Sequence, residues 1–151
     1  MSLKQSSSRT ALDAARAATR LARQVAVALG DLDLSPSQYR LLLFLSEGNA
    51  AASAVAGRLA VSRPSVTALA DGLERRGLLQ RKSDPVDRRK VAHELTDAGR
   101  KTLAAADLAV AERITGIADH LGADQAEQAL EGLAIWNEAL TRARGQQEAP
   151  K

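Results

Sequence analysis

The sequence predicts a mainly α-helical chain that carries a single two-stranded hairpin. Through most of its 151 residues, apolar side chains recur every three or four positions, which is the period of an amphipathic helix. Alanine, a strong helix former, supplies much of the 45% hydrophobic content. The exception is the segment 78–95, where two short runs flank Asp84-Pro85-Val86-Asp87, a sequence suited to a tight turn.

Capping residues set the boundaries of the expected elements. Ser35-Pro36-Ser37-Gln38 supplies the cap, the first-turn proline and the glutamine of a capping box. Gly30 and Gly77 are expected to stop the helices that precede them, and Thr96 to cap a long one. The expected helices cover residues 10–29, 36 to about 48, 51–59, 62–76, 97 to about 120 and 124–144, with strands at 78–82 and 90–95. The two chain ends, 1–9 and 145–151, are expected to be loose.

The composition excludes several classes of chemistry. The chain has no cysteine, so it forms no disulfide and no thiolate metal site, and its two isolated histidines make a metal site improbable. No Ser/His/Asp or Cys/His arrangement and no glycine-rich phosphate loop is present, so neither an enzyme nor a cofactor is expected. No apolar run approaches the roughly 18–20 residues of a membrane span, and the N-terminus lacks a hydrophobic signal core. We therefore expect a cytoplasmic protein without membrane contact.

Charge is distributed unevenly along the chain. Residues 58–101 carry eleven basic and six acidic side chains, whereas residues 102–151 carry four basic and eight acidic ones. A cationic centre is the charge pattern that attracts phosphates, so the sequence favours a nucleic-acid partner for the central segment. The alternative is charge that serves only solubility.

The order of elements between residues 51 and 95 is typical of a winged helix-turn-helix, in which two short helices precede a hairpin. In the second helix, 62–76, Val66, Leu69, Ala70 and Leu73 form a stripe that is expected to face the core. The first turn and the opposite face would enter the major groove of DNA. The residues expected there are Ser62, Arg63, Pro64, Ser65, Thr67 and Ala68. The alternative is an ordinary capped surface helix.

The hairpin tip carries three adjacent cations, Arg88, Arg89 and Lys90, directly after Asp87. Like charges on a protruding loop repel one another unless an anion receives them, and arginine fits the negative minor groove. We expect these residues to contact DNA, with Asp87 orienting an arginine. A solvated charged turn is the alternative.

Four motifs follow one another between Leu59 and Gly99. They are the helix start 62–67, the passage Leu73-Glu74-Arg75-Arg76-Gly77-Leu78-Leu79, the wing Asp84-Pro85-x-Asp87-Arg88-Arg89, and Leu95-Thr96-x-x-Gly99. In this order and spacing the run resembles the MarR family of bacterial transcriptional regulators. The resemblance implies a homodimer that binds a palindromic operator. It also implies, for many members, relief of repression by a small aromatic or phenolic anion. The implied organisation is a DNA-binding domain at 31–96 and a dimerisation module made of 1–30 and 97–151.

The residues themselves also favour a dimer. The two C-terminal helices carry apolar stripes that a small winged unit cannot cover, and an equivalent chain is the simplest partner. The stripes are Leu103, Val110, Ile114, Ile117 and Leu121, then Leu130, Leu133, Trp136 and Leu140. The alternative is a compact monomer whose helices fold back over the winged unit.

The sequence leaves the roles of two residues, Tyr39 and His93, open. Tyr39 is the best candidate for a polar contact in an effector pocket, although a core tyrosine whose hydroxyl bonds the backbone is the favoured interpretation. His93 replaces the aliphatic residue that the family usually has on the return strand. We expect it to pack at the sheet edge with its tip in water, and a pH- or ligand-sensitive site is the alternative.

The function that the sequence favours is a sequence-specific DNA-binding transcriptional regulator, in particular a homodimeric repressor with double-stranded operator DNA as its partner. Two alternatives stay open. One is a sequence-neutral DNA-binding protein, and the other is a helical protein-interaction module that does not bind DNA.

Overall fold

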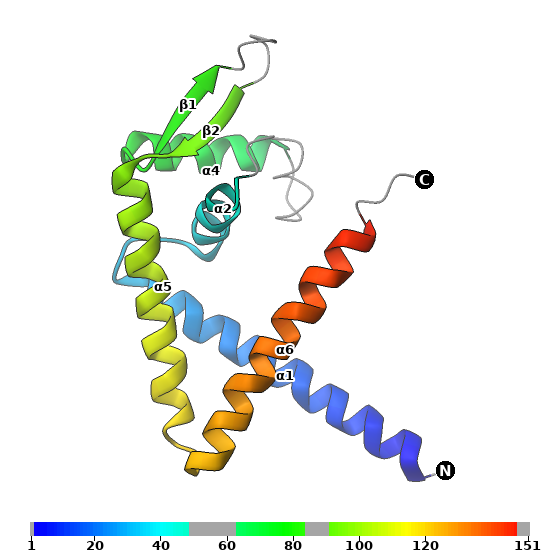
Figure 1. Cartoon of the computed structure of the whole chain (residues 1–151). Helices are drawn as coiled ribbons and strands as arrows, with labels where there is room; N and C mark the ends of the chain where they lie inside the picture. Colours follow the sequence, from blue (N-terminus) through cyan, green and yellow to red (C-terminus); the bar gives the residue numbers. More distant parts are fainter. Residues whose placement is uncertain (1, 49–62, 84–90, 148–151) are drawn as a thin grey trace. The chain divides into compact units, whose positions relative to one another are not determined.

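The computed structural model describes residues 2–48, 63–83 and 91–147, without the side chains of 2–8, 63, 83, 91 and 144–147, and shows a mainly helical chain with an antiparallel hairpin (Figure 1). The elements are α1 (Ser2–Gly30), α2 (Pro36–Ser46), α4 (Arg63–Arg75), β1 (Leu79–Ser83), β2 (Val91–Leu95), α5 (Asp97–Ala118) and α6 (Ala123–Gln147). The helix expected at 51–59 lies outside the described residues. The chain forms two compact units, 1–110 and 111–151, so that α5 begins in the first and ends in the second.

Helix α1 ends at Gly30, as the sequence predicted, but it begins earlier and its cap differs. It begins at Ser2, so the expectation that residues 1–9 are loose was wrong for 2–9. That stretch contains no proline or glycine, so nothing local stops the helix. At the other end the left-handed residue is Asp33, with a φ of 53°, and not Gly30. The amide of Leu34 donates to Leu29 O at 3.1 Å and that of Asp33 to Gly30 O at 3.0 Å, which is the hydrogen-bond pattern of a Schellman cap.

Helix α2 begins as predicted, with a complete capping box. The amide of Gln38 donates to Ser35 Oγ at 3.2 Å, and the amide of Ser35 donates to Gln38 Oε1 at 2.9 Å. Four apolar residues of α2 are buried, namely Leu41, Leu42, Phe44 and Leu45. The helix therefore lies at the centre of the first unit, where it contacts α1, α4 and β2.

Helix α4 ends at a left-handed glycine, also as predicted. Gly77 has a φ of 70°, its amide donates to Glu74 O at 2.8 Å, and the amide of Leu78 donates to Leu73 O at 3.0 Å. Leu73 and Leu78 are both buried, which is the apolar contact that accompanies this cap. The chain thereby reverses directly into β1.

The hairpin pairs β1 with β2 in a fixed register. Leu79 lies opposite Leu95, and two residues farther along Arg81 lies opposite His93. Because alternate residues of a strand share a face, Arg81 and His93 are on the same face as the buried leucine pair. β1 also contacts α4, which places the recognition-helix candidate beneath the hairpin (Figure 1).

The start of α5 is locked onto the turn that follows α4. Thr96 is the predicted cap, since Gly99 N donates to its Oγ1 at 3.0 Å. The same hydroxyl donates to Gly77 O at 2.6 Å, and the amide of Thr96 donates to Leu78 O at 3.1 Å. A Cβ on Gly99 would overlap the Leu78 carbonyl oxygen, so this close approach requires glycine.

The second unit contains the end of α5 and α6. Helix α6 runs three residues into the tail that was expected to be loose, because Gly145 does not interrupt it. Its large apolar side chains are exposed, namely Leu130, Leu133, Ile135, Trp136 and Leu140. Among the described helices, none combines the length and apolar character that crossing a membrane requires.

Candidate nucleic-acid interface

Helix α4 has the two faces that the sequence predicted. Val66, Ala70 and Leu73 are at most 5% exposed and belong to the main apolar cluster. Of the predicted DNA contacts, Pro64, Ser65, Thr67 and Ala68 are exposed along the opposite face. Ser62 and the side chain of Arg63 lie outside the described residues. The structure thus brings four of the six together on one outward row, and their contact with DNA stays a prediction.

The predicted wing residues, Asp87, Arg88, Arg89 and Lys90, also lie outside the described residues. The two strands that carry them are described, and the Leu79–Leu95 pair at the base of the hairpin is buried. The base of the wing is therefore anchored in the same core as α4.

A polar cluster that the sequence analysis missed joins α4 to the hairpin. Arg81 on β1 bridges two carboxylates of α4, with its Nη2 2.8 Å from Asp71 Oδ1 and its Nε 3.1 Å from Glu74 Oε2. This pairing gives both acidic side chains a partner within the protein. The sequence did hold a signal for this cluster. Asp71 and Glu74 are three residues apart, so they share a helix face, and Arg81 follows the inward Leu79 by two residues, so it shares that strand face.

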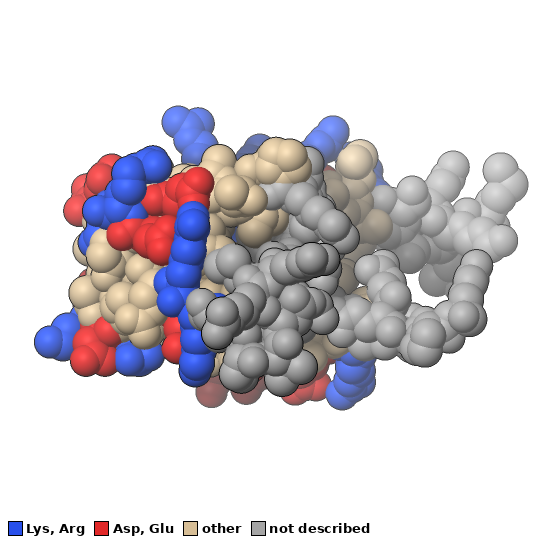
Figure 2. All heavy atoms as spheres, turned by 90° about the horizontal axis from the view of Figure 1, so that it is seen from above, with Lys and Arg blue, Asp and Glu red and all other residues tan. Residues whose placement is uncertain are grey.

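The described part of this face is mixed in charge. Figure 2, which looks down on it, shows basic side chains interleaved with acidic ones. On the hairpin, Lys82 Nζ lies 2.6 Å from Glu94 Oε1, so this cation is also paired. Much of the basic excess of residues 58–101 belongs to positions whose side chains are not described, namely Arg58, Arg63, Arg88, Arg89 and Lys90.

Tyr39 has a partner that the sequence did not predict. Its hydroxyl donates to Asp107 Oδ1 on α5 at 2.6 Å, so the expected backbone partner was wrong. Burial raises the pKa of Tyr39 above its ordinary value, and the hydrogen bond to Asp107 and the negative charge of that carboxylate raise it further. The side chain therefore ties α2 to α5 as a neutral phenol.

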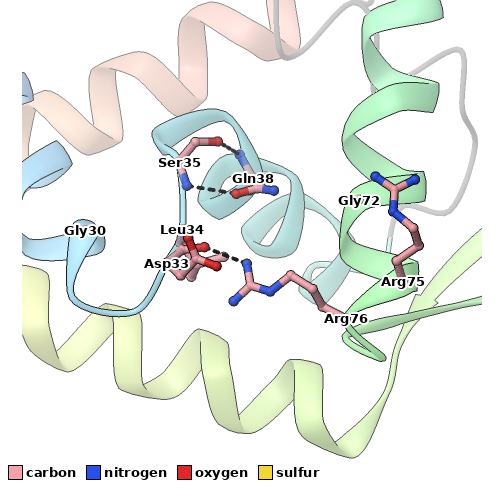
Figure 3. Close-up of a pocket in the computed structure, with 8 residues that line it drawn as sticks. All are labelled: Gly30, Asp33, Leu34, Ser35, Gln38, Gly72, Arg75 and Arg76. Carbon is pink, nitrogen blue, oxygen red and sulfur yellow. Dashed lines mark hydrogen bonds between the residues drawn. The ribbon is translucent and has the colours of Figure 1, made fainter.

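A hollow of about 550 Å³ lies elsewhere, between the end of α1, the start of α2 and the end of α4 (Figure 3). Arg76 crosses it to donate to Asp33 O at 2.6 Å and to Leu32 O at 3.2 Å. Arg75 also lines it, is exposed, and makes no hydrogen bond or ion pair with a described residue. Among the described residues, the Arg75 guanidinium is thus an unpaired cation in this hollow, beside the capping box of α2.

His93 is not wet at its tip, contrary to the sequence expectation. Its Nε2 is buried and finds no hydrogen-bond partner among the described residues. The residue as a whole is half-buried, and its strand position lies on the face toward α4. Within the described ranges, no group of three or more metal-binding side chains occurs here or elsewhere.

Comparison with known proteins identifies this architecture. A family model described as the MarR family matches residues 32–90. The solved transcriptional repressor CouR, bound to a 23-mer DNA duplex, is 34% identical, with 83% of this chain and 89% of CouR covered and a TM-score of 0.66. The transcriptional regulator BldR from Sulfolobus solfataricus is 28% identical over 94% of this chain and 99% of BldR, with a TM-score of 0.70.

More distant structures share the fold. MarR from E. coli, solved in its apo form, is 20% identical over 83% of this chain and 88% of that chain, with a TM-score of 0.67. No curated protein matches the chain in sequence. The family model matches the centre of the chain, and CouR is 34% identical over most of both chains. The chain therefore belongs to the MarR family of transcriptional regulators.

Proposed function

We propose that this MarR-family regulator is a homodimeric repressor that binds a palindromic operator through α4 and the wing. The observation that carries the proposal is the outward row of Pro64, Ser65, Thr67 and Ala68 on a helix whose other side is buried. Small polar and methyl-bearing side chains near a helix N-terminus suit base edges in the major groove. The relative CouR, a transcriptional repressor bound to a DNA duplex, supports the same role.

In this proposal residues 31–96 form the DNA-binding domain and residues 1–30 and 97–151 the dimerisation module. Arg88 and Arg89 then enter the minor groove, oriented by Asp87 and assisted by Lys90, while Ser62 and Arg63 complete the helix contacts. Two-fold symmetry places the two recognition helices about 34–36 Å apart, which is one turn of DNA.

Arg89→Ala is expected to raise the Kd for operator DNA about tenfold and to flatten its salt dependence by about 0.9 in log–log slope, because one phosphate or groove cation is lost. Fluorescence anisotropy with labelled operator at several salt concentrations measures both. Arg142→Ala, which removes the same charge from exposed α6, is the control and keeps wild-type binding. Equal binding of Arg89→Ala and wild type would refute the wing assignment.

The two alternatives are separated by the same assay. Equal affinity for operator and random duplexes would identify a sequence-neutral binder. No binding at low salt, where phosphate contacts are strongest, would identify a protein-interaction module.

The homodimer is supported by the exposed apolar side chains of α6, since a helix with so little cover depends on packing against a partner. Trp136, the only tryptophan, is 63% exposed in the single chain. We expect light scattering to give a dimer with blue-shifted Trp136 emission. Leu133→Asp is expected to halve the mass and shift the emission to longer wavelength, while Glu138→Gln changes neither. A wild-type monomer would refute the dimer.

The hollow beside Arg75 is the site that we assign to a small aromatic or phenolic anion as effector. A carboxylate there would pair with Arg75 and hold the end of α4 to the α1–α2 connection. With salicylate as the probe, we expect thermal stabilisation and release of operator DNA, both lost in Arg75→Ala and retained in Arg16→Ala. Salicylate that stabilises Arg75→Ala as much as wild type would refute this site.

A further inference from the structure

One titratable side chain at the joint between α4 and the hairpin has no role in the contacts described above. His93 lies opposite Arg81 in the strand register, on the face that looks toward α4. Its Nε2 is buried without a hydrogen-bond partner among the described residues. A buried polar atom without a partner is costly, which makes this ring a candidate for a second state in which it is paired.

The charges around His93 are unbalanced when the ring is neutral. From α4, Asp71 and Glu74 face the joint, and from β1, Arg81 does, so two carboxylates share one guanidinium. Helix α2 also contacts β2, and its buried residues are apolar. One proton on His93 would make the cluster neutral.

The present arrangement nevertheless favours the neutral ring. Burial lowers the pKa of His93, the positive charge of Arg81 lowers it further, and the carboxylates of Glu74 and Asp71 oppose this effect without cancelling it. Both carboxylates already accept from Arg81, so a protonated ring gains an acceptor only by competing with that guanidinium. Protonation of His93 therefore disfavours the ion pairs of Arg81 with Asp71 and Glu74, and these ion pairs disfavour protonation of His93.

We propose that His93 is a proton-sensitive element of the joint between the recognition helix and the wing: protonation draws Asp71 or Glu74 away from Arg81, loosens α4 from the hairpin and weakens DNA binding in mildly acidic solution. The effect on DNA rests on the proposed function, whereas the proton site itself does not. The direction of this pH dependence follows from the linkage between proton binding and stability. A histidine whose pKa is lowered in the ordered arrangement stabilises that arrangement above about pH 6.5, and this contribution is lost as the pH falls below that value.

The chain offers a direct measurement, because it contains only two histidines. The other histidine, His120, is exposed just after the end of α5, with its Nδ1 3.1 Å from Gly116 O, and it lies outside the joint. We expect NMR titration of the full-length protein between pH 8 and 5 to show the His93 ring titrating below about 6.5, the ordinary pKa of a histidine. The amide signals of Asp71, Glu74 and Arg81 are expected to follow the His93 curve. Titration of His93 at about 6.5 with no response of these amides would overturn the proposal.

DNA binding supplies the second readout. At constant ionic strength, acidification from pH 7.5 to 5.5 is expected to raise the Kd of wild type, and the increase is expected to follow the protonation curve of His93 that the NMR titration measures. His93→Leu, which restores an aliphatic residue, is expected to lose this extra acid sensitivity, and His120→Gln to keep it. The same acid response in His93→Leu and wild type would overturn the proposal. Absence of DNA binding at pH 7.5 would refute the proposed function instead, and the NMR titration would still decide the proton site.

Discussion

Gly99→Ala is expected to lower the free energy of unfolding by about 3 kcal/mol, the upper end of the usual cost of overpacking. The new Cβ would overlap the Leu78 carbonyl oxygen and would lie 3.2 Å from Leu95 Cδ2. The carbonyl cannot move away freely, because it accepts from the amide of Thr96 at 3.1 Å. Urea unfolding followed by circular dichroism, at one protein concentration, measures the change.

The matched control lies on the same helix. A Cβ at Gly116 meets no described atom within 4 Å, and alanine is the better helix former by about 0.5–1 kcal/mol. Gly116→Ala is therefore expected to be neutral or stabilising. If Gly99→Ala were as stable as Gly116→Ala, the close approach of α5 to residue 78 would be wrong.

Leu73→Ala is expected to cost about 3 kcal/mol, within the range for a leucine deleted from a packed core. Leu73 is fully buried, and along α4 it lies between Asp71 and Glu74, the two residues that Arg81 bridges. The cavity left behind would loosen the helix from the core even though the residue faces away from the proposed DNA side. The same urea experiment measures the stability, and anisotropy with operator DNA measures the binding.

Thr67→Ala tests the other face of the same helix. Thr67 is exposed, so its truncation is expected to change stability by no more than about 0.5 kcal/mol while weakening operator binding. The two variants thereby separate packing from recognition on one helix. A large loss of stability in Thr67→Ala, with none in Leu73→Ala, would reverse the assignment of the two faces.

The features that the sequence predicted well are local ones. The capping box of Ser35 and Gln38, the left-handed Gly77 and the cap at Thr96 each depend on residues within a few positions, so their signals are complete in a short segment. The inward stripe of α4 was likewise predictable, because helical period alone determines which side chains share a face.

The features that were missed depend on distant parts of the chain. The bond from Tyr39 to Asp107 spans 68 positions, and Arg76 reaches carbonyls 43 and 44 positions away. The burial of His93 Nε2 depends on how closely the hairpin lies on α4, which alternation along a strand does not reveal. The left-handed Asp33 was missed because glycine three residues earlier is the stronger statistical signal for a helix end.

Thr96 makes two hydrogen bonds to the backbone, one to Gly77 and one to Leu78. These bonds fix the start of α5, which follows the hairpin, to the end of α4, which precedes it. The first turn of α5 is consequently held rigidly against the turn that follows α4. A displacement of α5 at its first turn would therefore also displace the turn at Gly77 and Leu78 that ends α4.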